Sequence, residues 1–194
     1  MKHAKKNHSM ISAAVLAIVA TAAVACSGSS DTTSSPPGEG GPASLTDGSQ
    51  VTSLLQSGIT QADQEKWSVA ATSFQNVLAI NPSNVYANYD LGVIAQSTGN
   101  SNEAISYYNK ALAANAAYTP AMYNEAILLE SSQPRQAIAV YQKIVRINPR
   151  ASTAYLRMAL VQAEQGDITD AKANDAKAVS IDPAFSKYNL PAKN

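Results

Sequence analysis

The side chains that most often carry catalysis or bind metals are scarce in this chain of 194 residues. Its histidines are His3 and His8, and its single cysteine is Cys26. Serine–histidine and cysteine–histidine nucleophiles and the common transition-metal sites need imidazole or thiolate groups in one place. We expect residues 1–25 to be removed, which would leave the mature chain without histidine. The sequence therefore predicts no catalytic residue and no metal site.

Carboxylate pairs are the remaining groups that could transfer protons. Glu125 and Glu130 are close in the sequence, as are Asp167 and Asp170. Nothing around them indicates acid–base chemistry, and surface charge or helix capping accounts for each of them better. The sequence has no calcium-binding loop and no dinucleotide-binding motif. We therefore expect a protein that is not an enzyme and needs no cofactor.

Residues 1–25 are organised like a secretory signal peptide. Three lysines precede an apolar run over residues 10–25 that is too short for a confident membrane span. Ordinary cleavage before Cys26 is compatible with Ala23-Val24-Ala25 and would leave an unpaired cysteine in a secreted protein. The same residues, 23–26, resemble the lipobox of bacterial lipoproteins, with Ala23 where leucine is commonest. That resemblance implies that Cys26 is lipidated and anchors the protein on the extracytoplasmic side of a cell membrane.

Composition separates a linker from the rest of the chain. Residues 26–50 are nearly all Ser, Thr, Gly, Pro and Asp after the cysteine, so we expect a disordered tether. Outside residues 1–25, whose only charges are three lysines, 11 basic residues (14 − 3) face 14 acidic ones. A mildly acidic chain without Lys/Arg clusters is a poor ligand for nucleic acid, because such binding depends on neutralising phosphates. We expect no nucleic-acid partner.

A short phrase recurs from residue 51 onward. The sequences Asn81-Pro82, Asn148-Pro149 and Asp182-Pro183, which we call the stop motif, each interrupt a helix-like run. Pro149 and Pro183 are separated by about 34 residues, a period that is typical of stacked helical hairpins. The same interval after Pro82 leads to Ala116, where the motif lacks its proline.

The same spacing recurs inside each unit. Alanine and an aromatic residue are four positions apart at Ala70/Phe74, Ala104/Tyr108 and Ala137/Tyr141, and a small residue occupies the equivalent place upstream. The small residues are Gly58, Gly92, Ala126 and Ala159. A small residue in the middle of one helix lets its partner approach, and the aromatic residue fills the facing groove. These residues resemble the tetratricopeptide repeat (TPR) family, with Asp175 where the last unit should have its aromatic residue.

The resemblance implies an all-α fold, a right-handed superhelical solenoid of about four antiparallel helix hairpins over residues 51–183. We expect a short cap or tail at 184–194. The predicted helix pairs are 51–64/67–80, 85–98/101–114, 119–131/134–147 and 152–165/168–181. The sequence predicts helix N-caps at Asn100 and Asp167, and Pro134 suits the first turn of a helix.

In TPR arrays the first helix of each hairpin lines a groove that holds a peptide or helix. The resemblance therefore implies a groove in this chain formed by Leu55, Ile59, Tyr86, Tyr89, Val93, Tyr123, Asn124, Ile127, Leu156, Arg157 and Leu160. Tyr89 and some of the aliphatic residues could equally serve to pack one repeat on the next. Family members that clamp a C-terminal carboxylate use a set of Lys and Asn residues, and the comparable places here are largely apolar.

Lipobox, tether and repeats together indicate a membrane-anchored adaptor that binds another envelope protein. One alternative is a module that binds a small molecule or a glycan in the cell envelope. Another is an assembly factor for a pilus or an outer-membrane complex. If the C-terminal segment leaves the last groove incompletely covered, we expect weak self-association through this end.

Overall fold

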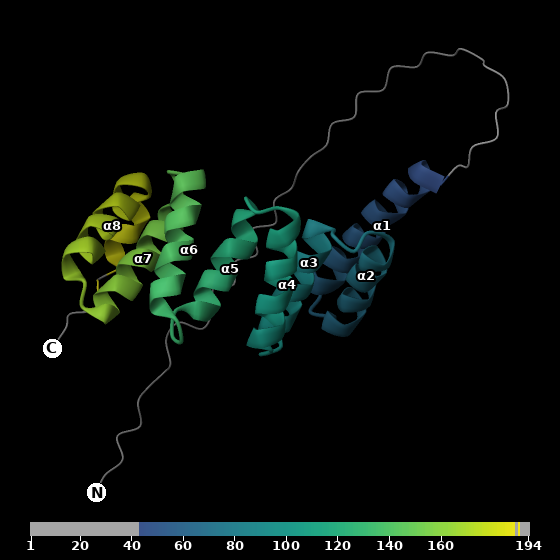
Figure 1. The fold of residues 1–194 in the computed structure, drawn as a ribbon, viewed down its shortest axis with the longest axis horizontal. Coiled ribbons are helices and arrows are strands. Elements are labelled where there is room, and N and C mark those ends of the chain that lie inside the picture. Colours follow the sequence, from purple (N-terminus) through teal and green to yellow (C-terminus); the bar gives the residue numbers. More distant parts are fainter. Residues whose placement is uncertain (1–42, 189, 191–194) are drawn as a thin grey trace, which may run out of the picture. The chain divides into compact units, whose positions relative to one another are not determined.

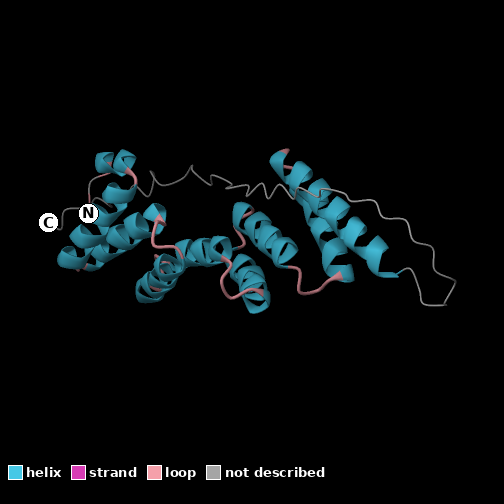
Figure 2. Ribbon diagram, turned by 90° about the horizontal axis from the view of Figure 1, so that it is seen from above, coloured by secondary structure: helices cyan, strands magenta, loops and turns pink. Residues whose placement is uncertain are grey.

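The structure, a computed structural model, describes residues 43–188 and Leu190. It contains eight α-helices followed by one turn of 3-10 helix, and no strand is present in this described part (Figures 1 and 2). The elements are α1 Ala43–Asp63, α2 Trp67–Ile80, α3 Val85–Ser97, α4 Ser101–Ala114, α5 Thr119–Leu129, α6 Pro134–Ile147, α7 Ser152–Gln165, α8 Ile168–Ile181 and η1 Pro183–Lys187. The predicted signal peptide, Cys26 and most of the predicted tether lie outside the described residues.

The helices pair as hairpins in chain order: α1 with α2, α3 with α4, α5 with α6, and α7 with α8 (Figure 1). Each second helix also contacts the first helix of the next hairpin, and α3 touches both α1 and α5. This arrangement confirms the predicted all-α array of helical hairpins.

Helix α1 begins at Ala43, ahead of the predicted start at position 51. The last part of the segment predicted to be a tether is therefore helical. The reason is that Ala43 and Leu45 are good helix formers, and within residues 43–50 only Gly48 strongly disfavours a helix. A helix that tertiary packing has formed over residues 51–63 can extend through such a segment at little cost.

The apolar core is a series of clusters, each shared between neighbouring hairpins. Phe74 of α2 packs with Leu91 of α3, Tyr108 of α4 packs with Ala121 of α5, and Tyr141 of α6 packs with Met158 of α7. A single hairpin could not bury these faces by itself, so each hairpin is stabilised by the next one.

Aromatic side chains explain why small residues recur in the first helices. A β-carbon added at Gly92 would lie 2.5 Å from Cε1 of Tyr108, and one at Gly58 would lie 2.6 Å from Cε1 of Phe74. Both rings are fully buried. The predicted partnership of a small residue with an aromatic ring is therefore confirmed for these two hairpins.

The stop motif ends each second helix in the same conformation. Asn81, Asn115, Asn148 and Asp182 have φ between −143° and −128° and ψ between 91° and 98°. In each of them the side-chain Oδ1 accepts a hydrogen bond from the backbone N–H two residues later, at 3.0–3.2 Å. This local bond, typical of an Asx turn, forms at Asn115 although Ala116 stands in place of proline.

The turns inside the hairpins differ from one another. Gly99 and Gly166 adopt positive φ values of 84° and 90°, and Glu65 does the same at 56° without being a glycine. In the third hairpin, α6 begins at Pro134 as predicted. Asn100 and Asp167 precede α4 and α8 as predicted, but neither side chain makes a capping hydrogen bond. Asn84 does make one, to the backbone N–H of Ala87 at 2.9 Å.

Candidate functional site

The candidate site is the face formed by the first helices α1, α3, α5 and α7, which we call the first-helix face. Tyr86 is the most open of its predicted residues, with 56% of its surface exposed, whereas Leu156 is buried. The others are half-buried: Leu55, Ile59, Tyr89, Val93, Tyr123, Asn124, Ile127, Arg157 and Leu160.

Several of these residues also pack the hairpins together. Leu55 and Ile59 lie against the cluster that contains Phe74, and Val93 lies against the cluster that contains Tyr108. Tyr123 stacks edge-on against Tyr141, with ring centroids 5.8 Å apart. The aliphatic part of the first-helix face therefore serves the core as well as the surface.

Four tyrosines form a connected aromatic group on α3, on α4 and just before α5; we call it the tyrosine group. The ring of Tyr118 meets Tyr86 at 5.9 Å and Tyr89 at 5.4 Å, both nearly perpendicular. Tyr89 in turn lies 6.0 Å from Tyr108. Edge-to-face contacts of this kind contribute about 0.5–1.5 kcal/mol per pair beyond area burial. Within the group Tyr108 is buried, Tyr89 and Tyr118 are half-buried, and Tyr86 is exposed.

A polar bridge joins the second hairpin to the third. The hydroxyl of Tyr108 donates to Oε1 of Gln96 at 2.7 Å, and Nδ2 of Asn124 lies 3.4 Å from the hydroxyls of both Tyr108 and Tyr89. Because these groups are partly buried, the hydrogen bonds replace contacts with water that folding removes.

An equivalent polar bridge joins the third hairpin to the fourth. The hydroxyl of Tyr141 donates to Oε1 of Glu130 at 2.6 Å, and Nε of Arg157 donates to the same oxygen at 2.8 Å. Nη2 of Arg157 completes a two-point contact with Oε2 of Glu130. Burial by itself would lower the pKa of Arg157, but the Glu130 carboxylate outweighs it and raises that pKa. Arg157 is therefore held as a cation that is already neutralised within the protein.

The junction between the first and second hairpins lacks such a bridge. The positions of Tyr108, Gln96 and Asn124 correspond there to Phe74, Ala62 and Asp90, one repeat earlier in each case. Phe74 and Ala62 can neither donate nor accept a hydrogen bond through their side chains. Within the described part of the chain, the carboxylate of Asp90 makes no hydrogen bond and no ion pair.

Asp90 is half-buried beside the tyrosine group, and its burial raises the pKa of its carboxyl to about 7. Its charge helps to raise the pKa of Tyr89, Tyr108 and Tyr118, in each case after burial as the main cause. The carboxylate and the three hydroxyls therefore share one electrostatic environment. Asp90 was not among the predicted groove residues, although its place one repeat before Asn124 could have revealed it.

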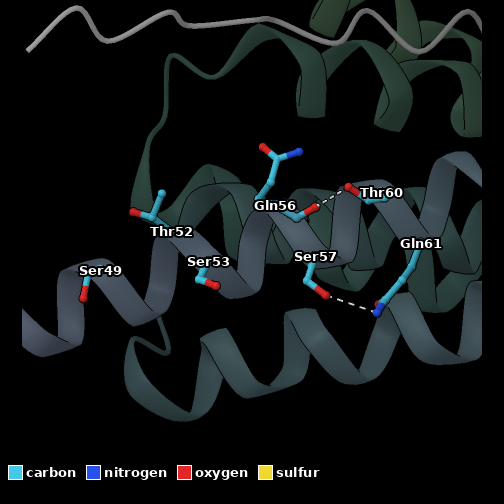
Figure 3. Close-up of a pocket in the computed structure, with 7 residues that line it drawn as sticks. All are labelled: Ser49, Thr52, Ser53, Gln56, Ser57, Thr60 and Gln61. Carbon is cyan, nitrogen blue, oxygen red and sulfur yellow. Dashed lines mark hydrogen bonds between the residues drawn. The ribbon is translucent and has the colours of Figure 1, made fainter.

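A separate pocket of about 550 Å³ lies along α1 (Figure 3). Its lining side chains are Ser49, Thr52, Ser53, Gln56, Ser57, Thr60 and Gln61, all uncharged and polar. Gln61 donates to Oγ of Ser57 at 3.1 Å and accepts from Oγ of Ser73 at 2.9 Å. The pocket thus offers hydroxyl and amide groups but no charge to a ligand.

Two further observations concern the described residues alone. They contain no group of three or more His, Cys, Asp or Glu side chains that could hold a metal ion. Among them, no helix combines the length and the apolar character that crossing a bilayer requires.

Known proteins share the repeat pattern of this chain. A sequence profile described as tetratricopeptide repeat matches residues 55–119 and 127–184, which together exceed half of the chain. The chain belongs to the tetratricopeptide repeat family. No curated protein matches it in sequence. TPR proteins are in general non-catalytic modules that bind other proteins. Membership of this family therefore indicates a role in protein–protein interaction.

Solved TPR structures share the fold. A crystal structure of MamA has a TM-score of 0.65 and 26% identity, covering 74% of this chain and 85% of MamA. MamA from Desulfovibrio magneticus RS-1 has a TM-score of 0.62 at 21% identity, over 69% of this chain and 76% of that one. YrrB, described as a TPR protein with an unusual peptide-binding site, has a TM-score of 0.60 at 21% identity, over 67% and 68%. The last two likenesses show the fold alone.

Proposed function

We propose that this TPR protein is a membrane-anchored, extracytoplasmic adaptor that binds a peptide or helix of an envelope protein through its first-helix face and has no catalytic activity. The observation that carries the proposal is the tyrosine group, in which the half-buried ring of Tyr118 packs against the exposed Tyr86 on that face. Aromatic residues supply large contact areas at low entropic cost and dominate many protein interfaces. The peptide-binding site named for YrrB is consistent with such a use of the fold.

The adaptor proposal is tested by capture from an envelope extract, with identification by crosslinking and mass spectrometry. Tyr86→Ala is expected to lose the captured partner because it removes the exposed ring. Val69→Ala is the control, since Val69 is also an exposed apolar side chain (49%) but lies on the second helix α2. Equal capture by both variants and the unmodified protein would contradict the use of this face.

The anchor is a separate proposal that rests on the resemblance of residues 23–26 to a lipobox. Metabolic labelling with a fatty acid is expected to mark the unmodified protein, and Cys26→Ser should abolish both the label and membrane association. If the Cys26→Ser variant remains in the membrane fraction, the anchor is not at this residue.

A second candidate function is the binding of a small molecule or glycan of the cell envelope. The pocket on α1 favours it, because Ser, Thr and Gln side chains match the hydroxyl groups of a sugar. Cell-wall fragments should then raise the melting temperature of the purified protein without any protein partner. Gln56→Ala, which removes an exposed side chain of the pocket, should reduce that shift, whereas the adaptor function predicts no shift.

The C-terminal end is the proposed place of weak self-association. There Phe185 stacks on Tyr188 with centroids 5.9 Å apart, and Oδ1 of Asp175 is buried without a hydrogen-bond partner. Size-exclusion chromatography with light scattering is expected to show a mass that rises with concentration. A constant monomer mass would remove this part of the proposal.

A further inference from the structure

Asp90 stands out among the acidic groups of the first helices because it is half-buried and has no basic side chain acting on it within the described residues, whereas Asp63 and Glu164 are exposed and Lys143 acts on Glu125. Its counterparts in the following hairpins, Asn124 and Arg157, each take part in a polar bridge to the preceding hairpin. At the first junction Phe74 and Ala62 replace the groups that would form such a bridge. A carboxylate that is partly removed from water without compensation is destabilising, and a cationic partner from outside the chain would supply that compensation.

In the described part of the chain, basic residues lie mostly away from the first helices. Among the described residues, Arg157 is the only basic residue on the four first helices, and Glu130 already engages it. The other basic residues lie on second helices, in turns or in the C-terminal turn: Lys66, Lys110, Arg135, Lys143, Arg146, Arg150, Lys172, Lys177 and Lys187. The same first helices carry Asp63, Asp90, Glu125 and Glu164. The first helices themselves therefore carry more acidic than basic side chains, which favours a cationic ligand.

The tyrosine group adds the second element of a cation site. Tyr86 precedes Asp90 by four residues on α3, which places both side chains on one side of the helix. The edge of Tyr86 meets the ring of Tyr118, and more than half of the Tyr86 surface is open to solvent. A planar guanidinium can stack on a tyrosine ring within about 6 Å of its centroid while it donates hydrogen bonds to a carboxylate.

We propose that Asp90 and Tyr86 form the anchor for an arginine side chain on the partner segment that the first-helix face binds. This inference rests on the proposed adaptor function and adds the chemistry of the partner: a segment with an arginine, rather than a free C-terminal carboxylate. The arginine pairs with Asp90 and lies against Tyr86, and thereby supplies the charge that the first junction lacks.

Binding of the arginine should depend on pH because Asp90 must be ionised to pair with it. Its carboxyl pKa is raised to about 7 by burial, so most of the population is protonated at pH 5.5 and ionised at pH 8.5. The titratable groups around it are Tyr89 on its own helix, Tyr108 from α4 and Tyr118 from the segment before α5, all with pKa values raised above the ordinary tyrosine value. Helix α2 carries no titratable side chain. On α1, the titratable side chain whose placement the structure describes is Asp63, and it is exposed. Helix α5 adds Glu125, whose pKa is also raised by burial, with Lys143 opposing the shift. Beside the tyrosine group, Asp90 is the carboxyl whose ionisation between pH 5.5 and 8.5 changes the charge.

The test uses the full chain and three acetylated, amidated pentapeptides, Ala-Ala-X-Ala-Ala, in which X is arginine, lysine or citrulline. Citrulline keeps the shape of arginine and lacks its charge. NMR titration at pH 8.5 is expected to give the order arginine, lysine, citrulline, with citrulline at least about tenfold weaker than arginine, the scale of a close charge pair. The affinity for the arginine peptide should fall about tenfold or more at pH 5.5.

Two variants locate the effect. Asp90→Asn is expected to weaken binding of the arginine peptide about tenfold and to remove its dependence on pH. Asp63→Asn, which neutralises an exposed acid on the first helices, should bind like the unmodified protein at both pH values. Equal binding of the arginine and citrulline peptides, or unchanged binding by Asp90→Asn, would overturn the inference. Chemical-shift changes at Tyr86 that grow with protein concentration alone would overturn it too, since the occupant would then be a second copy.

The outcome is separable from that of the adaptor proposal. If Asp90→Asn still captures the envelope partner while Tyr86→Ala does not, the adaptor function stands and the arginine anchor is wrong. If the peptide results are as expected but neither variant alters capture, the arginine site exists and the face is not the one that binds the envelope partner.

Discussion

Gly58 and Gly92 lie where the aromatic ring of the paired helix leaves no room for a β-carbon. Glycine in the interior of a helix is unfavourable by about 0.5–1 kcal/mol relative to alanine, so packing must outweigh propensity at these two positions. Close approach of α3 to α4 requires Gly92, whereas Asp90, two residues earlier, makes no hydrogen bond or ion pair within the described residues. Packing against the ring of the paired helix thus explains Gly92, whereas the charge of Asp90 is left uncompensated.

Replacing Gly92 with alanine should destabilise the protein by about 1–2 kcal/mol. The added β-carbon would meet the Tyr108 ring at 2.5 Å, and overpacking of this kind costs about 1–3 kcal/mol, offset in part by helix propensity. Gly48→Ala is the control, because nothing lies within 4 Å of its β-carbon position in α1. Urea denaturation should show a gain of up to about 1 kcal/mol for the control. A neutral or stabilising Gly92→Ala would contradict the packing argument.

Asp90→Asn should stabilise the isolated protein at pH 8 and have little effect at pH 4. The folded-state pKa of Asp90, about 7, lies above the ordinary value of an aspartate, so the folded state binds the proton more tightly. The unfolding free energy of the unmodified protein therefore falls as the pH rises from about 4 to about 7, by no more than about 4 kcal/mol from this group. Urea denaturation of both proteins across this range measures the difference. A stability difference that does not change with pH would show that Asp90 has its ordinary pKa.

At the scale of elements, the boundary between hairpins depends on the side chain of Asn or Asp more than on proline. The second occurrence along the chain, Asn115-Ala116, has the same backbone conformation and the same Oδ1 hydrogen bond as the others. Proline adds rigidity in the unfolded chain, because it restricts φ before folding begins.

Ala116→Pro is therefore expected to stabilise the protein by about 0.4–1 kcal/mol. Asn115 already has the extended conformation that a residue before proline needs, φ −143° and ψ 96°. Ala117→Pro is the matched control, since it removes the N–H that donates to Oδ1 of Asn115 at 3.0 Å. It should lower the thermal midpoint while Ala116→Pro raises it. The reverse order would show that the side-chain bond does not set this boundary.

Helix boundaries could be predicted closely from the sequence because they depend on local signals that recur in every hairpin. Apart from α1, the described helices begin at the predicted residue and end within two residues of the predicted end. The predicted start of α1 was wrong because Ser, Thr and Gly are common in both linkers and short helical extensions. The capping bonds expected at Asn100 and Asp167 are absent, since capping depends on side-chain geometry that residue type alone does not determine.

The candidate site could be predicted only in part. Tyr86, Tyr89 and Arg157 were predicted from repeat positions, but Tyr118, which joins Tyr86 to Tyr89, was not. The Glu130 contact that neutralises Arg157 joins residues 27 apart and leaves no local signal. The absence of a polar bridge at Asp90 is still harder to predict, because it follows from the lack of hydrogen-bonding groups in the side chains of Phe74 and Ala62.

At the scale of the whole molecule, the described residues form a series of neighbouring apolar cores that differ in the size of the side chains they bury. The aromatic position filled by Phe74, Tyr108 and Tyr141 is occupied by Asp175 in the last hairpin. Only Ala171 and Ala178 of α8 are buried, and η1 is the one short element that follows it in the described chain. In repeat proteins each unit depends mainly on its neighbours, so this end should be the least stable part of the array.

Native-state hydrogen exchange should show this inequality. Amides of α8 are expected to open at a free energy roughly 1–3 kcal/mol below those of α4 and α6, because opening the end exposes less apolar surface. Asp175→Phe should slow exchange in α8, and Lys172→Ala, an exposed change on the same helix, should leave it nearly unaltered. Equal protection of α8 and α4 would mean that the array unfolds as one cooperative unit.

The Oδ1 hydrogen bond of the stop motif spans only two residues, so the turn from one hairpin to the next is encoded within a few codons. A gene that duplicates or deletes a segment between two such points would keep every junction intact. The length of the array is therefore free to vary during evolution, while features that depend on a mismatch between neighbours, such as the unpaired Asp90, belong to one particular order of units.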